Sequence, residues 1–122
     1  MNFLWTAIYV NNLNTSLSFY KDIVGLKVTR QFEAGPGVEI AFMGRGEKNE
    51  TLVELIQDRG KKDIDYCKEV SIGFAVDSVD KKMQGMKDKG IKIQEGPVET
   101  PKSKFFYIED PDGFRVQFVQ FV

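Results

Sequence analysis

Residues 70–79, VSIGFAVDSV, decide the fold because they repeat the pattern of residues 3–13, FLWTAIYVNNL. Both stretches are rich in β-branched and aromatic residues, as strands are, and both end in polar residues that can cap a helix. The segment Val10-Asn11-Asn12-Leu13 matches Val76-Asp77-Ser78-Val79 at a shift of 66 positions. We therefore expect one strand-to-helix transition to occur twice in the chain.

After the first transition, apolar residues at helical spacing predict a helix that starts at Leu13. Gly25 is expected to end this helix, because glycine readily adopts the left-handed conformation of a helix stop. A turn is expected at residues 34–37, AGPG. The strands of the first half are predicted at residues 3–10, 26–32, 38–43 and 51–57.

The second half follows the same order. Asp77 or Ser78 is expected to cap a helix that ends at Gly90, with Val79, Met83 and Met86 along one stripe. Turns are predicted at Gly96-Pro97 and at residues 110–113, DPDG. The strands of the second half are predicted at residues 70–76, 91–94, 103–109 and 114–121.

The chain is thus predicted to be an α+β protein made of two tandem β-α-β-β-β modules. Neither half has enough apolar residues for a stable core of its own, so we expect the two to pack together or with modules of another chain, and we assign residues 1–122 to one domain. The first module is assigned to residues 1–60 and the second to residues 70–122. A charged linker without clear periodicity is expected at about residues 58–69.

Composition excludes several classes of function. The chain of 122 residues has 17 Lys+Arg against 18 Asp+Glu, without the basic surplus that nucleic-acid binders carry. It has no histidine, which excludes Ser-His-Asp and Cys-His catalysis and His-ligated zinc. Its one cysteine, Cys67, is expected to be an inert thiol in a reducing compartment. No targeting or membrane-spanning segment is recognised, so we expect a cytoplasmic protein with neither membrane nor nucleic acid as a partner.

Three local motifs carry a family resemblance: Asn12-Leu13 with Ser16, Phe19, Tyr20 and Gly25-Leu26; Thr51–Leu55 (TLVEL); and Ile108–Phe114 (IEDPDGF). In this order and spacing they resemble the vicinal oxygen chelate superfamily. This family includes glyoxalase I, methylmalonyl-CoA epimerase, extradiol dioxygenases, and fosfomycin- and bleomycin-resistance proteins. The resemblance implies curved mixed sheets around a cavity, with the helices on the outer face.

The resemblance also implies where a metal would be held, by one residue from each of four strands. In this chain those positions are Trp5, Glu54, Ser71 and Gln117. Only Glu54 keeps an ionic ligand, because an indole N–H donates and cannot ligate, while the Ser and Gln oxygens are weak neutral donors. We therefore expect no metal cofactor, although weak binding of a divalent ion such as Mg²⁺ or Mn²⁺ stays open.

The site residues leave three roles open for Glu54 and two for Trp5. Glu54 is expected to face the cavity beside Trp5 and within reach of Gln117, where it could pair with a cationic ligand, act as a general base, or be held without chemistry. Trp5 could stack on a planar ligand or fill the space of the metal. Tyr9 shares its face, whereas the faces of Phe42, Phe105 and Tyr107 depend on strand register.

Two functions follow as hypotheses. The first is a metal-independent protein of the bleomycin-resistance type, which binds an aromatic or cationic small molecule through Trp5, Tyr9, Glu54, Ser71 and Gln117. The second is a glyoxalase-like lyase, isomerase or epimerase in which Glu54 is the catalytic base and Ser71, Gln117 or Tyr9 donates to the oxyanion, with or without a weakly held metal. Extradiol cleavage is not expected, since it needs a His/carboxylate metal set. We expect a homodimer in either case, because cavities of this family often lie between two chains.

Overall fold

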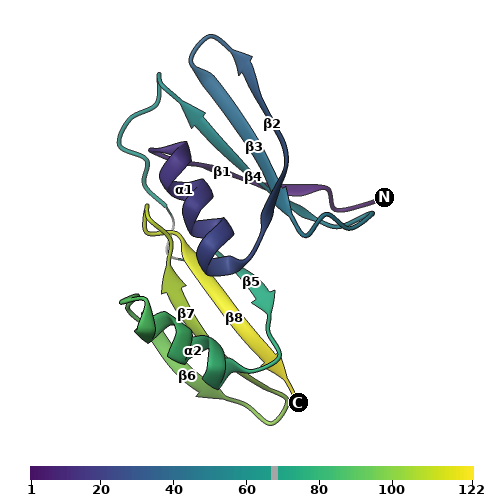
Figure 1. The fold of residues 1–122 in the computed structure, drawn as a ribbon, viewed down its shortest axis with the longest axis vertical. Coiled ribbons are helices and arrows are strands. Elements are labelled where there is room, and N and C mark those ends of the chain that lie inside the picture. Colours follow the sequence, from purple (N-terminus) through teal and green to yellow (C-terminus); the bar gives the residue numbers. More distant parts are fainter. Residues whose placement is uncertain (67–68) are drawn as a thin grey trace. The chain divides into compact units, whose positions relative to one another are not determined.

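The computed structural model describes residues 1–66 and 69–122, and the chain divides into two compact units, Met1–Asp65 and Tyr66–Val122. Within the described residues, each unit has one four-stranded sheet and one α-helix (Figure 1). The α+β class and the two tandem modules are therefore confirmed. The boundary between the units falls inside the predicted linker, while the assignment of residues 1–122 to a single domain stays a prediction.

The sheet of the first unit has the strand order β1-β4-β3-β2. Its strands are β1 (Trp5–Tyr9), β2 (Lys27–Gly35), β3 (Val38–Gly44) and β4 (Leu52–Asp58). Strands β2, β3 and β4 are antiparallel neighbours, whereas β1 runs parallel to β4. The tight β2–β3 hairpin requires the antiparallel arrangement. Because β2 runs on to Gly35, only the end of the predicted 34–37 turn is a turn.

The predicted first helix is present but has two parts, α1 (Leu13–Phe19) and a π-helical turn, η1 (Tyr20–Val24). At its start, the Asn12 side chain accepts a 3.0 Å hydrogen bond from the Thr15 backbone N–H. At its end, Gly25 has a φ of 95°, the left-handed conformation that favours glycine. Both predicted ends are therefore confirmed, with asparagine and glycine in the expected roles.

The core of the first unit lies between α1 and one face of its sheet (Figure 1). Successive strand residues point to opposite faces, so every second residue of β1, β3 and β4 is directed toward the helix. Most of these positions are apolar and buried, and three further residues join them, whereas Glu39 and Gln57 lie on the same side at the hairpin end. The buried set is Ile8, Ala41, Met43, Val53 and Leu55, with Val10, Leu13 and Tyr20. Each fully buried aliphatic side chain contributes about 1.5–3 kcal/mol. This face therefore holds the unit together.

The sheet of the second unit has the matching strand order β5-β8-β7-β6, and β5 runs parallel to β8. Its elements are β5 (Ser71–Ala75), α2 (Val79–Asp88), β6 (Glu95–Glu99), β7 (Ser103–Glu109) and β8 (Arg115–Phe121). Ser78 caps α2 through a 3.2 Å hydrogen bond from the Lys81 N–H, and the predicted stripe Val79, Met83 and Met86 is buried. The internal repeat is thereby confirmed.

Strand register shows which residues of the two copies are equivalent. In the first sheet, Glu54 of β4 pairs with Ala7 of β1 and with Phe42 of β3. In the second sheet, Gln117 of β8 pairs with Gly73 of β5 and with Tyr107 of β7. Glu54 and Gln117 therefore occupy the same place in the two copies.

The predicted strand at residues 91–94 and the turn at Gly96-Pro97 are wrong. Residues 91–94 are not a strand, and Gly96 and Pro97 lie inside β6, where the register with β7 shifts between Glu95 and Val98. Proline cannot donate to a strand ladder, but an edge strand with a bulge tolerates it. Because β6 is the edge of its sheet, the pair bends a strand instead of ending one.

The predicted turn at Asp110–Gly113 is confirmed. The Gly113 N–H donates a 3.0 Å hydrogen bond to the Asp110 carbonyl. The Asp110 carboxylate accepts hydrogen bonds from the N–H groups of Asp112 (2.9 Å) and Phe114 (2.8 Å). This short-range capping is the reason that aspartate favours the first position of such turns.

The segment between the units carries neither helix nor strand in its described residues, 59–66 and 69–70. The expectation of an inert Cys67 lies outside the described residues. Among the residues described, neither helix has the length and apolar character needed to cross a bilayer.

Candidate functional site

Glu54 lies at the centre of the face of the first sheet that points away from α1. Its neighbours across the strands are Ala7 on one side and Phe42 on the other. Residues paired in register share a face, and every second residue along a strand returns to it. Trp5 and Tyr9, two residues before and after Ala7, therefore lie on the same face as Glu54. The structure thus brings together three of the five predicted ligand-binding residues.

Aromatic rings cover much of this face. The Trp5 and Phe42 rings meet edge to face with centroids 5.2 Å apart, and Phe32 stacks on Phe42 at 6.3 Å. Trp5 is 45% exposed and Tyr9 38% exposed, although both are large aromatic residues. We call the surface formed by Trp5, Tyr9, Phe32, Phe42 and Glu54 the aromatic face. Its exposed rings offer flat apolar area for contact with another flat molecule.

Glu54 is the unusual member of the aromatic face, because it is an ionisable residue that is only 9% exposed. In the part of the chain that the structure describes, its carboxylate makes neither a hydrogen bond nor an ion pair. Burial raises the pKa of Glu54 above the usual value for glutamate, since desolvation disfavours the charged form. A carboxylate so placed can attract a cation or accept a proton.

Three contributors to this face were not predicted from the sequence: Arg30, Phe32 and the orientation of Phe42. The Arg30 guanidinium lies over the Phe32 ring, 4.5 Å from its centroid. The register between β2 and β3 shifts between Val28 and Arg30. Such a bulge inverts the side-chain alternation, so periodicity alone could not place these residues on the face of Glu54. The Arg-x-Phe spacing is a signal that could have suggested the stacked pair.

The other two predicted residues, Ser71 and Gln117, lie on the equivalent face of the second sheet. Ser71 is exposed at the start of β5. Gln117 lies next to Gly73, and a Cβ added to Gly73 would meet the Gln117 Oε1 at 2.9 Å. Tyr107 shares this face and carries the Arg115 guanidinium 4.0 Å from its ring centroid. This face is therefore polar and uncharged at the position equivalent to Glu54.

The four positions at which the family resemblance implies a metal do not offer a donor set that fits zinc or nickel. Zinc is bound by thiolate, imidazole and carboxylate groups. Trp5 offers only an N–H donor, Ser71 and Gln117 offer neutral oxygens, and Glu54 alone is ionisable. Among the described residues, no three His, Cys, Asp or Glu side chains gather in a group suited to a metal ion.

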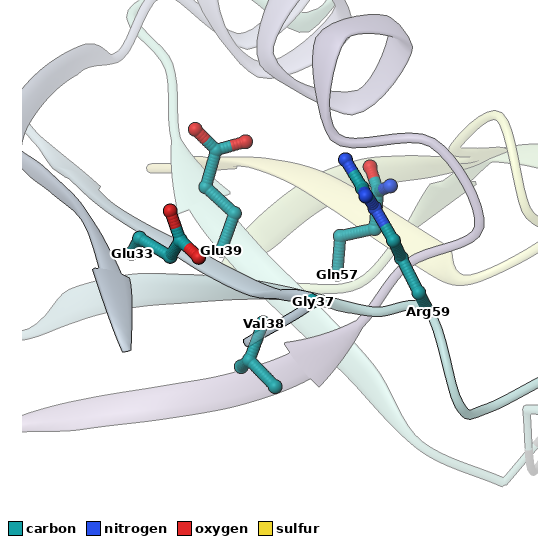
Figure 2. A pocket seen from close by; sticks show the side chains of 6 residues that line it. All are labelled: Glu33, Gly37, Val38, Glu39, Gln57 and Arg59. Carbon is teal, nitrogen blue, oxygen red and sulfur yellow. The ribbon is translucent and has the colours of Figure 1, made fainter. Parts of the chain in front are cut away.

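A separate cavity of about 280 Å³ lies at the hairpin end of the first sheet (Figure 2). Its lining residues are Glu33, Gly37, Val38, Glu39, Gln57 and Arg59. Glu39 and Gln57 pair with each other and alternate with Ile40 and Ile56, so they point to the α1 side of the sheet. None of the predicted site residues lines this cavity, and it is distinct from the aromatic face.

Comparison with known proteins shows a similarity that extends beyond the three local motifs at residues 12–26, 51–55 and 108–114. The chain is 30% identical over 125 aligned residues to the probable lactoylglutathione lyase of Synechocystis sp., covering 98% of this chain and 95% of that protein. The glyoxalase I of Zea mays aligns with a TM-score of 0.82 and 29% identity, over 98% of this chain and 44% of that one. The trypanothione-dependent glyoxalase I of Leishmania major has a TM-score of 0.85 at 24% identity, over 98% of this chain and 86% of that one, which shows a shared fold alone.

The sequence profile of the Glyoxalase/Bleomycin resistance protein/Dioxygenase superfamily matches residues 2–118, nearly the whole chain. This match spans both copies of the repeat, including Trp5, Glu54, Ser71 and Gln117. The resemblance expected from the motifs is therefore confirmed: the chain belongs to the glyoxalase/bleomycin resistance protein/dioxygenase superfamily.

Proposed function

We propose that this protein binds an aromatic or cationic small molecule on the aromatic face without a resident metal ion. The observation that carries the proposal is the Glu54 carboxylate, which is 9% exposed and has no partner among the described residues. An isolated buried carboxylate is costly to keep charged. A bound cation would relieve this cost and would gain a charge-assisted contact.

The neighbouring rings suit the same kind of ligand. Trp5 is nearly half exposed and meets Phe42 edge to face, so it can stack on a planar molecule. Cations are also attracted to the face of an indole ring. A flat cation would therefore use both Trp5 and Glu54, whereas a flat neutral molecule would use Trp5 alone.

A fluorescence titration tests this proposal directly, because Trp5 is the only tryptophan in the chain. We expect planar cations, such as acridinium and amidinium compounds, to change the Trp5 emission at lower concentration than neutral compounds of the same shape. Glu54→Gln should remove this preference for cations and spare the binding of neutral rings. Glu33→Gln is the matched control, because Glu33 is an exposed carboxylate directed to the opposite face of the sheet.

A lack of any response across planar cations and planar neutral compounds would contradict the proposal. An equal loss of cation binding in Glu54→Gln and Glu33→Gln would also contradict it, because the effect would then come from overall charge.

A second candidate function is a lyase or isomerase step, favoured by the 30% identity to the probable lactoylglutathione lyase of Synechocystis sp.. Glu54 would remove a proton from a hydroxyl-bearing carbon beside a carbonyl group and return it to the former carbonyl carbon, while the hydroxyl proton passes to the former carbonyl oxygen, so that the product is an isomer and atoms and charge balance. Tyr9 shares the aromatic face and could donate a hydrogen bond to the oxygen that becomes negative. Ser71 and Gln117 are the other proposed donors.

This second function is tested by incubating the protein with methylglyoxal and glutathione, which combine to a hemithioacetal, and following the formation of lactoylglutathione by chromatography, in chelator and with added Mg²⁺ or Mn²⁺. Turnover by the wild type that is abolished in Glu54→Gln, with ligand binding retained, would support the role of base. Equal turnover in the two proteins would show that Glu54 is not the base.

We also propose that two copies of the chain associate, as the family resemblance implies. Sedimentation equilibrium of the purified protein would give a mass of twice 13.9 kDa if this is right. A single species of 13.9 kDa at high protein concentration would contradict it.

A further inference from the structure

The aromatic face carries two opposite charges in one row across the first sheet. Glu54 of β4 pairs with Phe42 of β3, and Phe42 pairs with Arg30 of β2. Neighbouring strands lie about 4.8 Å apart, so the backbones of Glu54 and Arg30 are separated by roughly 10 Å. Phe42 lies between them. A carboxylate and a guanidinium thus flank one aromatic ring on a rigid sheet.

Arg30 has the features of a group that can hold an anion. Its side chain is exposed, and its guanidinium lies 4.5 Å from the centroid of the Phe32 ring. In the described chain it makes no ion pair or hydrogen bond through this side chain. The ring occupies one flat side of the guanidinium, whereas the N–H groups project from its edge, where they can hold a carboxylate with two hydrogen bonds.

Aromatic rings lie between the two charges. Phe32 stacks on Phe42 and Trp5 meets Phe42 edge to face, so that Phe42 itself is only 7% exposed. A flat ligand body can lie on the more exposed rings, those of Trp5 and Phe32. At the Glu54 end, the carboxylate is buried and without a partner, which favours a cationic group there. The row therefore has a negative end, an aromatic floor and a positive end.

We propose that the ligand of the aromatic face is a flat zwitterionic molecule, with a cationic group that meets Glu54 and a carboxylate-type group roughly 10 Å away that meets Arg30. This inference rests on the proposed binding function and adds the second charge and the spacing. Arg30 is then a specificity-determining residue. Neutral and purely cationic flat molecules still bind to the aromatic face, but a ligand that also carries an anionic group near Arg30 binds more tightly.

Two matched probes test the inference. The first is 4′-amidinobiphenyl-4-carboxylate, whose rigid biphenyl separates amidinium and carboxylate by about 10 Å, twice the strand spacing. The second is 4-amidinobiphenyl, which lacks the carboxylate. We expect Trp5 fluorescence titrations to show about tenfold tighter binding of the first probe, the size of effect of one charge-assisted contact.

Variants identify which residue binds each charged group of the probes. Arg30→Gln should make the two probes bind equally, and Arg30→Lys should keep part of the preference, because it retains the charge but not the paired N–H groups. Glu54→Gln should weaken both probes alike. Lys61→Gln is the matched control, because the Lys61 Nζ also lies over a ring of this face, 4.7 Å from the Tyr9 centroid, but outside the row.

The outcomes separate this inference from the function on which it rests. Equal binding of both probes to the wild type, with Glu54→Gln still weakening them, would overturn the inference and leave the binding function standing. A preference abolished by Lys61→Gln and retained in Arg30→Gln would also overturn it. If neither probe binds, both the inference and cation binding at Glu54 are wrong. Thermal unfolding of each variant checks that it is folded.

Discussion

The Leu13 backbone N–H donates a 2.6 Å hydrogen bond to Oε1 of Gln57, so a side chain near the end of β4 satisfies the first turn of α1. The second copy repeats this relationship, since the Val79 N–H donates to Gln120 Oε1 at 2.9 Å. Helix starts leave backbone N–H groups without partners inside the helix. Each copy therefore satisfies one of them from its sheet and another from its cap residue, Asn12 or Ser78.

Replacing Gln57 by Leu should destabilise the protein by about 1 kcal/mol, because the partly buried Leu13 N–H then loses its acceptor. Urea unfolding measures the change. Gln84→Leu is the control, since the Gln84 amide bonds only to the exposed Asp88 carboxylate within α2. An equal decrease in the free energy of unfolding in the two variants would show that the Gln57 hydrogen bond contributes no more than an exposed one.

Ser16→Ala should stabilise the protein. Among the described residues, the Ser16 hydroxyl is fully buried without a hydrogen-bond partner. Removing an unsatisfied hydroxyl and introducing a better helix former should together raise the free energy of unfolding by about 1–2 kcal/mol. The exposed Ser18 lies in the same helix, and Ser18→Ala should gain only about 0.5 kcal/mol from helix propensity. A lower free energy of unfolding for Ser16→Ala would mean that the hydroxyl makes a stabilising hydrogen bond.

Glu54→Gln should change how stability depends on pH. Burial raises the pKa of Glu54 in the folded state above its usual value of 4.5. Folding therefore takes up a proton, so this contribution is full below the unfolded pKa and is lost as pH rises through the folded pKa. The variant lacks this loss and should gain stability over the wild type from pH 4 to pH 8, as urea unfolding at each pH would show. A constant difference across that range would contradict a raised pKa.

Gly73→Ala should displace the Gln117 side chain, because the new Cβ would lie 2.9 Å from Gln117 Oε1. The side-chain amide resonances of Gln117 should shift, while the amide resonances of the neighbouring strand β8 stay near their wild-type positions. Gly85→Ala is the control, since nothing lies within 4 Å of its added Cβ in α2. That control should stabilise the protein by roughly 1 kcal/mol and leave Gln117 unchanged.

Metal content is the fifth property that the residues predict. Protein purified without chelators should contain far less than one Zn, Ni, Mn or Fe ion per chain, because Trp5, Ser71 and Gln117 supply no ionic ligand beside Glu54. Elemental analysis measures this content. A chelator should likewise leave the unfolding temperature unchanged, since a bound ion would stabilise the folded state. A stoichiometric ion would overturn our interpretation of Trp5 and Ser71.

The sequence predicts the elements well where the signals are local. Asn12, Ser78 and Gly25 mark helix ends through their own side chains or backbone freedom, and the Asp110–Gly113 turn is closed by bonds within a few residues. The strand β6 was misplaced because the effect of Gly96-Pro97 depends on strand position in the sheet. Only the assembled sheet shows that β6 is an edge.

The candidate site was predictable only in part for the same reason. Trp5 and Tyr9 share a face with Glu54 because β1 and β4 are regular and their alternation is simple. The side of Phe42, and the arrival of Arg30, depend on pairing between strands and on the bulge in β2. Neither of these positions can be predicted from the periodicity of a single strand.

The two copies differ on one face of the sheet and agree on the other, which separates the residues that stabilise the fold from those available for binding. On the helix side, equivalent positions stay apolar in both copies, as in Val53 and Val116 or Met43 and Ile108. On the other side they change chemical class, from Trp5 to Ser71 and from the Glu54 acid to the Gln117 amide. One surface of each sheet is thus committed to folding, whereas the other is free to diverge. A duplicated half can therefore acquire new recognition chemistry without endangering its own stability.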